Sequence, residues 1–133
     1  MRIGTVAERS GVPAKTIRYY EEVGLIEAAD RTASGYRDYD HNDVETLRFI
    51  QRARSLGFSV NEVANLLALW RDRQRASAQV KKLASDHVAR IDLKIAELQS
   101  MRDTLVDLIE RCHGDHRPDC PILKDLAGES ELV

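Results

Sequence analysis

The sequence predicts a mainly α-helical protein with a winged helix-turn-helix head, one long helix and a C-terminal loop that carries two cysteines. Three observations predict this fold class: two short helical segments flank a Gly/Pro turn near the N-terminus, a Gly-centred extended stretch follows, and residues 77–111 contain neither Pro nor Gly. We expect three parts, which are a head over residues 1–75, a long helix over residues 76–111 and a loop with a short helix over residues 112–133.

Two short helices open the chain. The spacing of apolar residues from Ile3 to Ala7 predicts the first helix, and the run Ser-Gly-Val-Pro at residues 10–13 interrupts it. The second helix is expected over about residues 14–23, with Gly24 at its C-terminal cap. Two short helices around a turn have the organisation of a helix-turn-helix.

A short hairpin is expected next. Residues 27–40 lack helical periodicity, and Ser34-Gly35 precede the alternating stretch Tyr-Arg-Asp-Tyr at residues 36–39. This pattern predicts two strands with their turn near Gly35. A hairpin beside a helix-turn-helix is a wing.

Two further helices are expected to complete a small core. Helical spacing resumes after Asn42 and Asp43, either of which can cap a helix, and Gly57 marks its end. The apolar face of this helix is expected to contain Val44, Leu47, Ile50 and Leu56. Ser59 and Glu62 form a capping box for the next helix. Its apolar face is expected to contain Val63, Leu66, Leu67 and Trp70.

Residues 77–111 are expected to form a single helix, because apolar residues recur every three to four positions over the whole segment. The apolar stripe consists of Ala84, Val88, Ile91, Ile95, Leu98, Leu105 and Ile109. No other segment of the chain is left to cover so long a stripe, and a second copy of the same helix is therefore the expected partner. The chain is expected to be a homodimer.

Length and composition restrict the class of protein. A chain of 133 residues is short for enclosing a substrate, and no base–nucleophile pair or cofactor loop is present, so an enzyme is not expected. No apolar run predicts a signal peptide or a membrane span, and a cytoplasmic protein without membrane contact is expected. The net charge of -2 does not indicate nucleic-acid binding, which has to be judged from the placement of individual charges.

Basic and aromatic residues gather in the helix-turn-helix and the hairpin. Arg and Lys neutralise phosphates and Tyr hydrogen-bonds to them, as contact with a DNA duplex requires. A solvated helix with scattered charges would explain the same composition. The candidate DNA-contacting residues are Lys15, Arg18, Tyr19, Arg31, Tyr36 and Arg37.

Two longer motifs favour the DNA interpretation. The run IRYYEEVGLI at residues 17–26, followed by GYRDY at residues 35–39, resembles the DNA-binding domain of the MerR family of transcription regulators. The resemblance continues through residues 54–59 and covers nearly the whole chain. It implies a dimer whose long helices pair as an antiparallel coiled coil and whose heads bind double-stranded promoter DNA. Positions that contact DNA in the family match Lys15, Arg18, Arg31, Tyr36 and Arg37.

The second group of candidate residues lies in the C-terminal loop, where seven residues including Gly114 and Pro118 separate Cys112 from Cys120. Such a loop can bring two thiolates together, and thiolates select Cu(I), zinc or iron–sulfur clusters. Two cysteines are too few for a cluster held by one chain. A structural disulfide is disfavoured in a reducing cytosol, and a pair of free cysteines remains the alternative. A short helix is expected around residues 122–126.

The loop resembles the metal-binding loop of the copper-efflux regulators, the CueR/HmrR branch of the MerR family, in its Cys, Gly-Asp, Asp-Cys-Pro-Ile and short helix. Ser77 stands where relatives that sense divalent ions carry a third cysteine. Lys81 matches a lysine near the site in the copper branch. Two thiolates and one Cu(I) sum to -1, which Lys81 and the N-terminal dipole of the helix that starts near Ser77 would compensate.

The resemblance implies a metal-responsive activator that senses Cu(I), with Ag(I) and Au(I) as related effectors. It would distort promoter DNA so that RNA polymerase engages it, and would control copper-efflux genes. Two alternatives remain open. One is a MerR-type sensor of a divalent ion such as Zn(II), with His113 or His116 replacing the third cysteine. The other is a coiled-coil copper carrier or dithiol redox protein that does not bind DNA.

Overall fold

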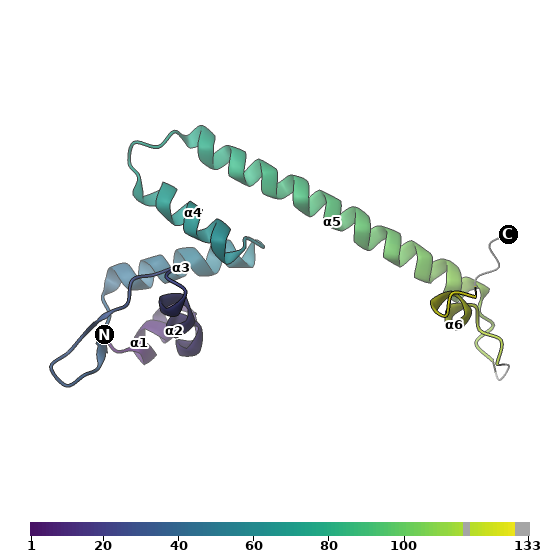
Figure 1. Cartoon of the computed structure of the whole chain (residues 1–133), viewed down its shortest axis with the longest axis horizontal. Helices are drawn as coiled ribbons and strands as arrows, with labels where there is room; N and C mark the ends of the chain where they lie inside the picture. The colour runs from purple at the N-terminus through teal and green to yellow at the C-terminus, as the bar shows by residue number, and fades with distance from the viewer. Residues whose placement is uncertain (116–117, 130–133) are drawn as a thin grey trace. The chain divides into compact units, whose positions relative to one another are not determined.

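The computed structural model describes residues 1–115 and 118–129, which form six α-helices and one two-stranded antiparallel sheet (Figure 1). The mainly α-helical fold class predicted from the sequence is confirmed. In chain order the elements are α1 (Ile3–Ser10), α2 (Ala14–Glu22), β1 (Asp30–Arg31), β2 (Arg37–Asp38), α3 (His41–Ser55), α4 (Val60–Arg71), α5 (Ser77–Arg111) and α6 (Pro121–Leu126).

The chain divides into two compact units, and the boundary lies inside α5. The first unit is Met1–Lys82 and the second begins at Leu83. The head, with its four short helices and its hairpin, belongs to the first unit. The functional division into residues 1–75, 76–111 and 112–133 stays a prediction.

A left-handed glycine follows each helix of the helix-turn-helix. Gly11 caps α1 with φ +76, a conformation that favours glycine, and its N–H donates to the Ala7 carbonyl at 3.0 Å. α2 ends at Glu22, one residue before the predicted end, and its C-cap is Val23 rather than the predicted Gly24, which follows with φ +78. The helix-turn-helix is therefore formed as the sequence predicts.

The wing is a minimal hairpin. β1 and β2 pair with Asp30 opposite Asp38 and Arg31 opposite Arg37. Gly35, with φ +83, lies in the turn as expected, and its N–H donates to the Thr32 carbonyl at 2.9 Å.

α3 begins earlier than expected, and the prediction that Asn42 or Asp43 caps it was wrong. Asp40 is the N-cap: its Oδ1 accepts from the Asp43 N–H at 3.0 Å, while Asp43 Oδ2 accepts from the Asp40 N–H at 2.9 Å. This is a capping box in which Asp43 takes the third helical position. The capping box predicted for α4, formed by Ser59 and Glu62, is confirmed.

The core of the head lies where the faces of α1 to α4 meet. Its fully buried side chains are Val6, Val12, Ile17, Leu47, Ile50 and Val63. Leu56 and Trp70 were wrongly assigned to this core, since they are 49% and 44% exposed. Leu56 is the C-cap of α3, and Trp70 stacks on Phe49 with ring centroids 4.5 Å apart. Both line an open, mainly apolar depression of about 660 Å³ on α3 and α4.

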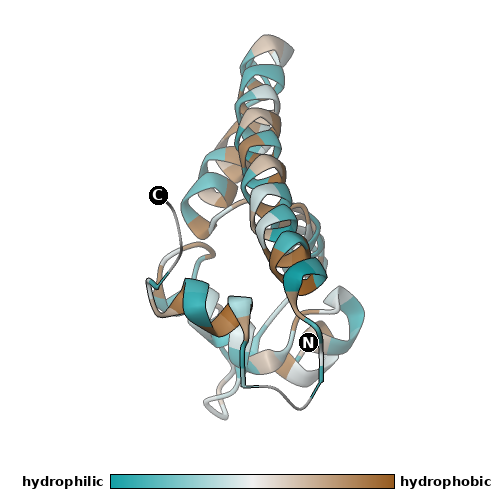
Figure 2. Cartoon of the chain, turned by 90° about the vertical axis from the view of Figure 1, so that its right-hand side faces the viewer, coloured by the Kyte–Doolittle hydropathy of each residue, from teal (hydrophilic) through white to brown (hydrophobic). Residues whose placement is uncertain are grey.

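α5 spans the predicted residues, and most of its apolar stripe is uncovered within one chain. Figure 2 shows hydrophobic and hydrophilic residues alternating along this helix. The exposed stripe residues are Val88, Ile91, Ile95, Leu98, Leu105 and Ile109, each at least 40% exposed. Among the described residues, no helix has both the length and the apolar character that crossing a lipid bilayer requires.

Candidate functional site

Four of the six candidate DNA-contacting residues meet in one open depression of about 770 Å³ in the head. They are Arg18 from α2 and Arg31, Tyr36 and Arg37 from the hairpin. The remaining lining residues are Arg2, Ile3, Gly4, Thr5, Glu8 and Gly35. α2 and the wing therefore share a surface with the start of α1.

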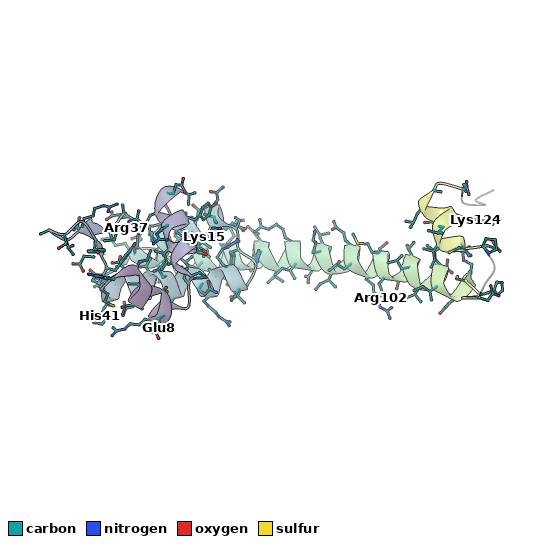
Figure 3. All side chains as sticks on the ribbon, turned by 90° about the horizontal axis from the view of Figure 1, so that it is seen from below. Glu8, Lys15, Arg37, His41, Arg102 and Lys124 are labelled. Carbon is teal, nitrogen blue, oxygen red and sulfur yellow. The ribbon has the colours of Figure 1, made fainter. Side chains whose placement is uncertain are left out.

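The other two candidates lie beside this depression on α2. Lys15 and Tyr19 are exposed, Tyr19 at 48%, and neither lines the depression. Figure 3 labels Lys15, Glu8 and Arg37 on the head. The whole set is thus accessible to a large anionic partner.

Internal hydrogen bonds fix the conformation of the wing. An Arg31 guanidinium nitrogen donates to the Gly35 carbonyl at 2.9 Å, and Thr32 Oγ1 accepts from the Tyr36 N–H at 3.2 Å. The backbone of the turn therefore holds Arg31 at the rim of the depression.

Arg2 is a residue of this surface that the sequence analysis missed. Its guanidinium carbon lies 4.0 Å from the centroid of the Tyr36 ring, which is a cation–π contact. Arg2 precedes the first helix and lies outside both motifs, so no pattern in the sequence indicates it.

Glu21 is a second residue that was missed, and it joins α2 to the wing. Its side chain is only 4% exposed; one carboxylate oxygen accepts from the Tyr39 hydroxyl, and the other lies 3.4 Å from Arg37 Nε. Burial, followed by the hydrogen bond to Glu21, raises the pKa of Tyr39 to about 12, and Arg37 partly opposes this. Helical spacing could have revealed Glu21, because it follows the buried Ile17 by four positions and so shares its face.

The structure brings the two predicted metal ligands together. Cys112 follows the last residue of α5, Cys120 is the N-cap of α6, and both are free and half-buried. The Cys112 side chain lies close enough to Cys120 to lower the pKa of its thiol. The short C-terminal helix predicted around residues 122–126 is also confirmed.

Backbone amides at the start of α6 stabilise a thiolate at Cys120. The backbone N–H groups of Leu123 and Ile122 and the Cys112 side chain lower the pKa of Cys120, whereas burial and the charge of Asp119 oppose this. Lys124 pairs with Asp119 at 2.9 Å. Pro121, a residue typical of the first helical position, could have indicated that Cys120 caps a helix.

The remaining predicted site residues are His113, His116, Ser77 and Lys81. His113 is exposed, and no group of three or more His, Cys, Asp or Glu side chains with metal-binding geometry occurs over residues 1–115 and 118–129. His116 lies outside the described residues. Ser77 begins α5 and Lys81 lies one turn later, while Cys112 follows its other end. A straight helix of this length spans about 52 Å.

Two family models match the chain. The model described as "MerR HTH family regulatory protein" matches residues 1–70. The model described as "MerR, DNA binding" matches residues 44–108. Together they include the helix-turn-helix, the wing and most of α5.

Individual relatives match over nearly the full length. The HTH-type transcriptional regulator HmrR of Sinorhizobium medicae is 58% identical over 127 residues, covering 96% of this chain and 86% of the relative. The regulator CueR of Salmonella typhimurium is 44% identical over 128 residues, covering 96% and 93%. These relatives are transcription regulators, in agreement with the expectation that the chain is not an enzyme.

Among solved structures, the transcription regulator PbrR691 from Ralstonia metallidurans CH34, in complex with lead(II), superimposes with a TM-score of 0.82. It is 30% identical, and the match covers 95% of this chain and 98% of that structure. The fold described above is therefore that of a known regulator over almost its entire length.

Proposed function

Because the chain belongs to the MerR family of transcription regulators, we propose that it is a Cu(I)-responsive activator that binds promoter DNA as a homodimer and acts there with RNA polymerase. The observation that carries the metal assignment is the paired arrangement of Cys112 and Cys120. As a regulator of genes it works in the cytoplasm, and copper-efflux genes are its proposed targets.

A pair of thiols fits a monovalent soft ion better than a divalent one. Two thiolates satisfy the linear, two-coordinate preference of a d10 monovalent cation, whereas zinc in proteins is usually held by three or four protein ligands. Within the described part of the chain, no third His, Cys, Asp or Glu completes such a set. Ag(I) and Au(I) share the charge and softness of Cu(I) and are proposed as further effectors.

The net charge of -1 on two thiolates with Cu(I) needs a compensating positive field. The N–H groups of Leu123 and Ile122, which lower the pKa of Cys120, supply part of it from the same chain. Lys81 is the fifth residue of α5, whereas Cys112 follows the last residue of the same helix. In the proposed dimer the long helices pair in antiparallel fashion, and Lys81 of the partner subunit supplies the remaining positive charge. Ser77 of the partner subunit approaches the thiols in the same dimer.

DNA binding is assigned to the depression in the head and to the exposed side of α2. Arg18, Arg31 and Arg37 face an anionic partner together there, with Lys15 and Tyr19 beside them. In the proposed activation, the dimer distorts the promoter so that polymerase can engage it. In this proposal the dimer exchanges between two shapes, and the metal shifts the equilibrium because it binds one shape more tightly than the other. The affinity for operator DNA need not change much.

Transcription from a candidate efflux promoter, measured against buffered Cu(I), Ag(I) and Zn(II), tests the proposal. Cys112→Ser and Cys120→Ser each leave one thiolate and should abolish the response to Cu(I) and Ag(I), while a gel shift shows that DNA binding persists. Replacing both His113 and His116 by Ala is the matched control, because a bis-thiolate site needs neither imidazole. Wild-type protein that responds to Zn(II), and loses this response in the His variant, would show a divalent Cys/His site instead.

Ser77→Cys tests the selectivity argument. A third thiolate raises the charge of the site to -2 with Cu(I) but only to -1 with Zn(II), so the ratio of Zn(II) to Cu(I) response should rise. An unchanged ratio of the Zn(II) to the Cu(I) response would show that Ser77 does not lie at the metal site. Failure of the wild-type protein to bind any promoter DNA would favour the carrier or redox alternative.

A further inference from the structure

We propose that Arg2 is a further DNA-contacting residue, which the ring of Tyr36 holds in place to complete a binding site for one backbone phosphate. The proposal rests on the DNA-binding role of the head and adds a contact to it. Neither motif that resembles the MerR family includes Arg2. Arg2 makes a cation–π contact with Tyr36 and lines the same depression as the predicted DNA-contacting residues.

The contact with the ring leaves N–H donors of Arg2 available. A cation–π contact is not a conventional hydrogen bond, so the planar fork of guanidinium donors can still bind an anion. At 4.0 Å from the ring centroid, Arg2 is in this range. Tyr36 is 52% exposed, so the pair lies at the surface where a duplex can reach it.

The charge of the depression favours an anion. Four guanidinium groups line it, from Arg2, Arg18, Arg31 and Arg37, against the single carboxylate of Glu8. Two of these groups have other partners, since Arg31 donates to the Gly35 carbonyl and Arg37 lies 3.4 Å from Glu21. Arg2 instead rests on a neutral ring, and its charge is not offset by that contact.

A backbone phosphate is the occupant that these features favour. Arg binds phosphate through two parallel N–H donors, and DNA presents phosphates in a continuous row along both strands. Phosphate contacts carry no sequence information directly. The contribution of Arg2 should therefore be the same for any duplex.

The test measures DNA affinity of the metal-free full-length protein by fluorescence anisotropy over a range of salt concentrations. The probes are a labelled duplex of arbitrary sequence and the promoter duplex of the transcription assay. Each neutralised phosphate contributes about 0.9 to the slope of log K against log salt, so Arg2→Ala should lower the slope by about 0.9 per head. At 0.1 M salt this corresponds to roughly eightfold weaker binding per head, by the same factor for both duplexes.

Arg9→Ala is the matched control, since Arg9 is an exposed arginine of α1, the helix that Arg2 precedes, and does not line the depression. It should leave the slope unchanged. A wild-type slope for Arg2→Ala, or an equal loss for Arg9→Ala, would overturn the proposal.

The role of the ring is tested by removing Arg2 in two further backgrounds. Tyr36→Phe keeps an aromatic face, so the loss caused by Arg2→Ala should persist there. Tyr36→Leu removes the face, and the loss should become smaller. Equal losses in both backgrounds would show that Tyr36 does not place Arg2. Because no metal is present in this assay, its outcome does not depend on Cu(I) sensing. A wild-type protein that does not respond to Cu(I) would contradict the proposed function but not the role of Arg2.

Discussion

Tyr39→Phe should destabilise the head and remove a specific part of its pH dependence. The Tyr39 side chain is 3% exposed, and its hydroxyl donates to the buried carboxylate of Glu21. Phenylalanine fills nearly the same space but leaves Glu21 without this donor. A hydrogen bond to a charged group contributes about 1.5–3 kcal/mol, so we expect a loss of about 2 kcal/mol in the free energy of unfolding near neutral pH.

The pH dependence follows from the raised pKa of about 12 in the folded protein, against 10.0 for an ordinary tyrosine. The unfolded chain loses this proton first, so Tyr39 stabilises the fold fully below pH 10 and progressively less up to pH 12. Two pKa units correspond to about 2.7 kcal/mol in total, of which about 1.4 kcal/mol should be lost by pH 11. Tyr39→Phe has no such loss, and its stability should approach that of wild type as the pH rises.

Urea unfolding of both proteins at a series of pH values from 7 to 11 measures this difference, and titration of other groups cancels in the comparison. Tyr36→Phe is the control, because Tyr36 is 52% exposed and its variant should stay within about 0.5 kcal/mol of wild type. A difference between Tyr39→Phe and wild type that does not change from pH 9 to pH 11 would refute the link between Tyr39 and Glu21.

Three further outcomes are expected. Joint replacement of Ile95 and Leu98 by Asp places charges in the exposed stripe of α5 and should dissociate the dimer; sedimentation equilibrium showing an intact dimer would rule out this interface. Arg18→Ala should weaken operator binding in a gel shift while Cu(I) stoichiometry is unchanged, and loss of metal binding alone would contradict the separation of the two sites. In urea unfolding, Gly4→Ala should stabilise the protein by about 0.5–1 kcal/mol and Gly11→Ala should destabilise it by about 1–2 kcal/mol, because Gly11, unlike Gly4, has a left-handed conformation. Changes of the same sign in the free energy of unfolding of the two variants would refute this explanation.

The sequence predicts elements best where local signals agree. The end of α5 was predicted correctly because Gly114 follows it closely and neither Pro nor Gly occurs inside the segment. The start of α3 was wrong because Asp40, Asn42 and Asp43 are all good cap residues. Which one caps depends on whether a partner lies three positions later, and here that partner is an Asp rather than the usual Glu or Gln.

Periodicity predicts which face of a helix is apolar, but not how far its neighbours cover that face. Leu56 and Trp70 have the spacing of core residues, yet the head has no further element to bury them. Their exposure is a tertiary property, and local sequence does not contain it.

The residues of the candidate site also differ in whether local sequence indicates their contacts. The pairing of Cys112 with Cys120 was predictable because a short loop connects them. Arg2 was not found because its partner Tyr36 lies far along the chain in the hairpin, whereas helical spacing places Glu21 on a buried face but does not indicate its partner Tyr39. Contacts of that kind follow from the packing of the hairpin against the helices.

The stacking of Trp70 on Phe49 gives this protein a built-in optical reporter. Trp70 is the single tryptophan of the chain, and it joins α4 to α3 in the head. Light absorbed selectively by the indole therefore yields emission from one known place, and its partial exposure makes its wavelength sensitive to water. Separation of the two helices would shift the emission to the red, whereas events confined to the cysteine loop would leave it unchanged unless they are transmitted to the head. Unlabelled protein can thus show whether metal binding is felt at the DNA-binding end.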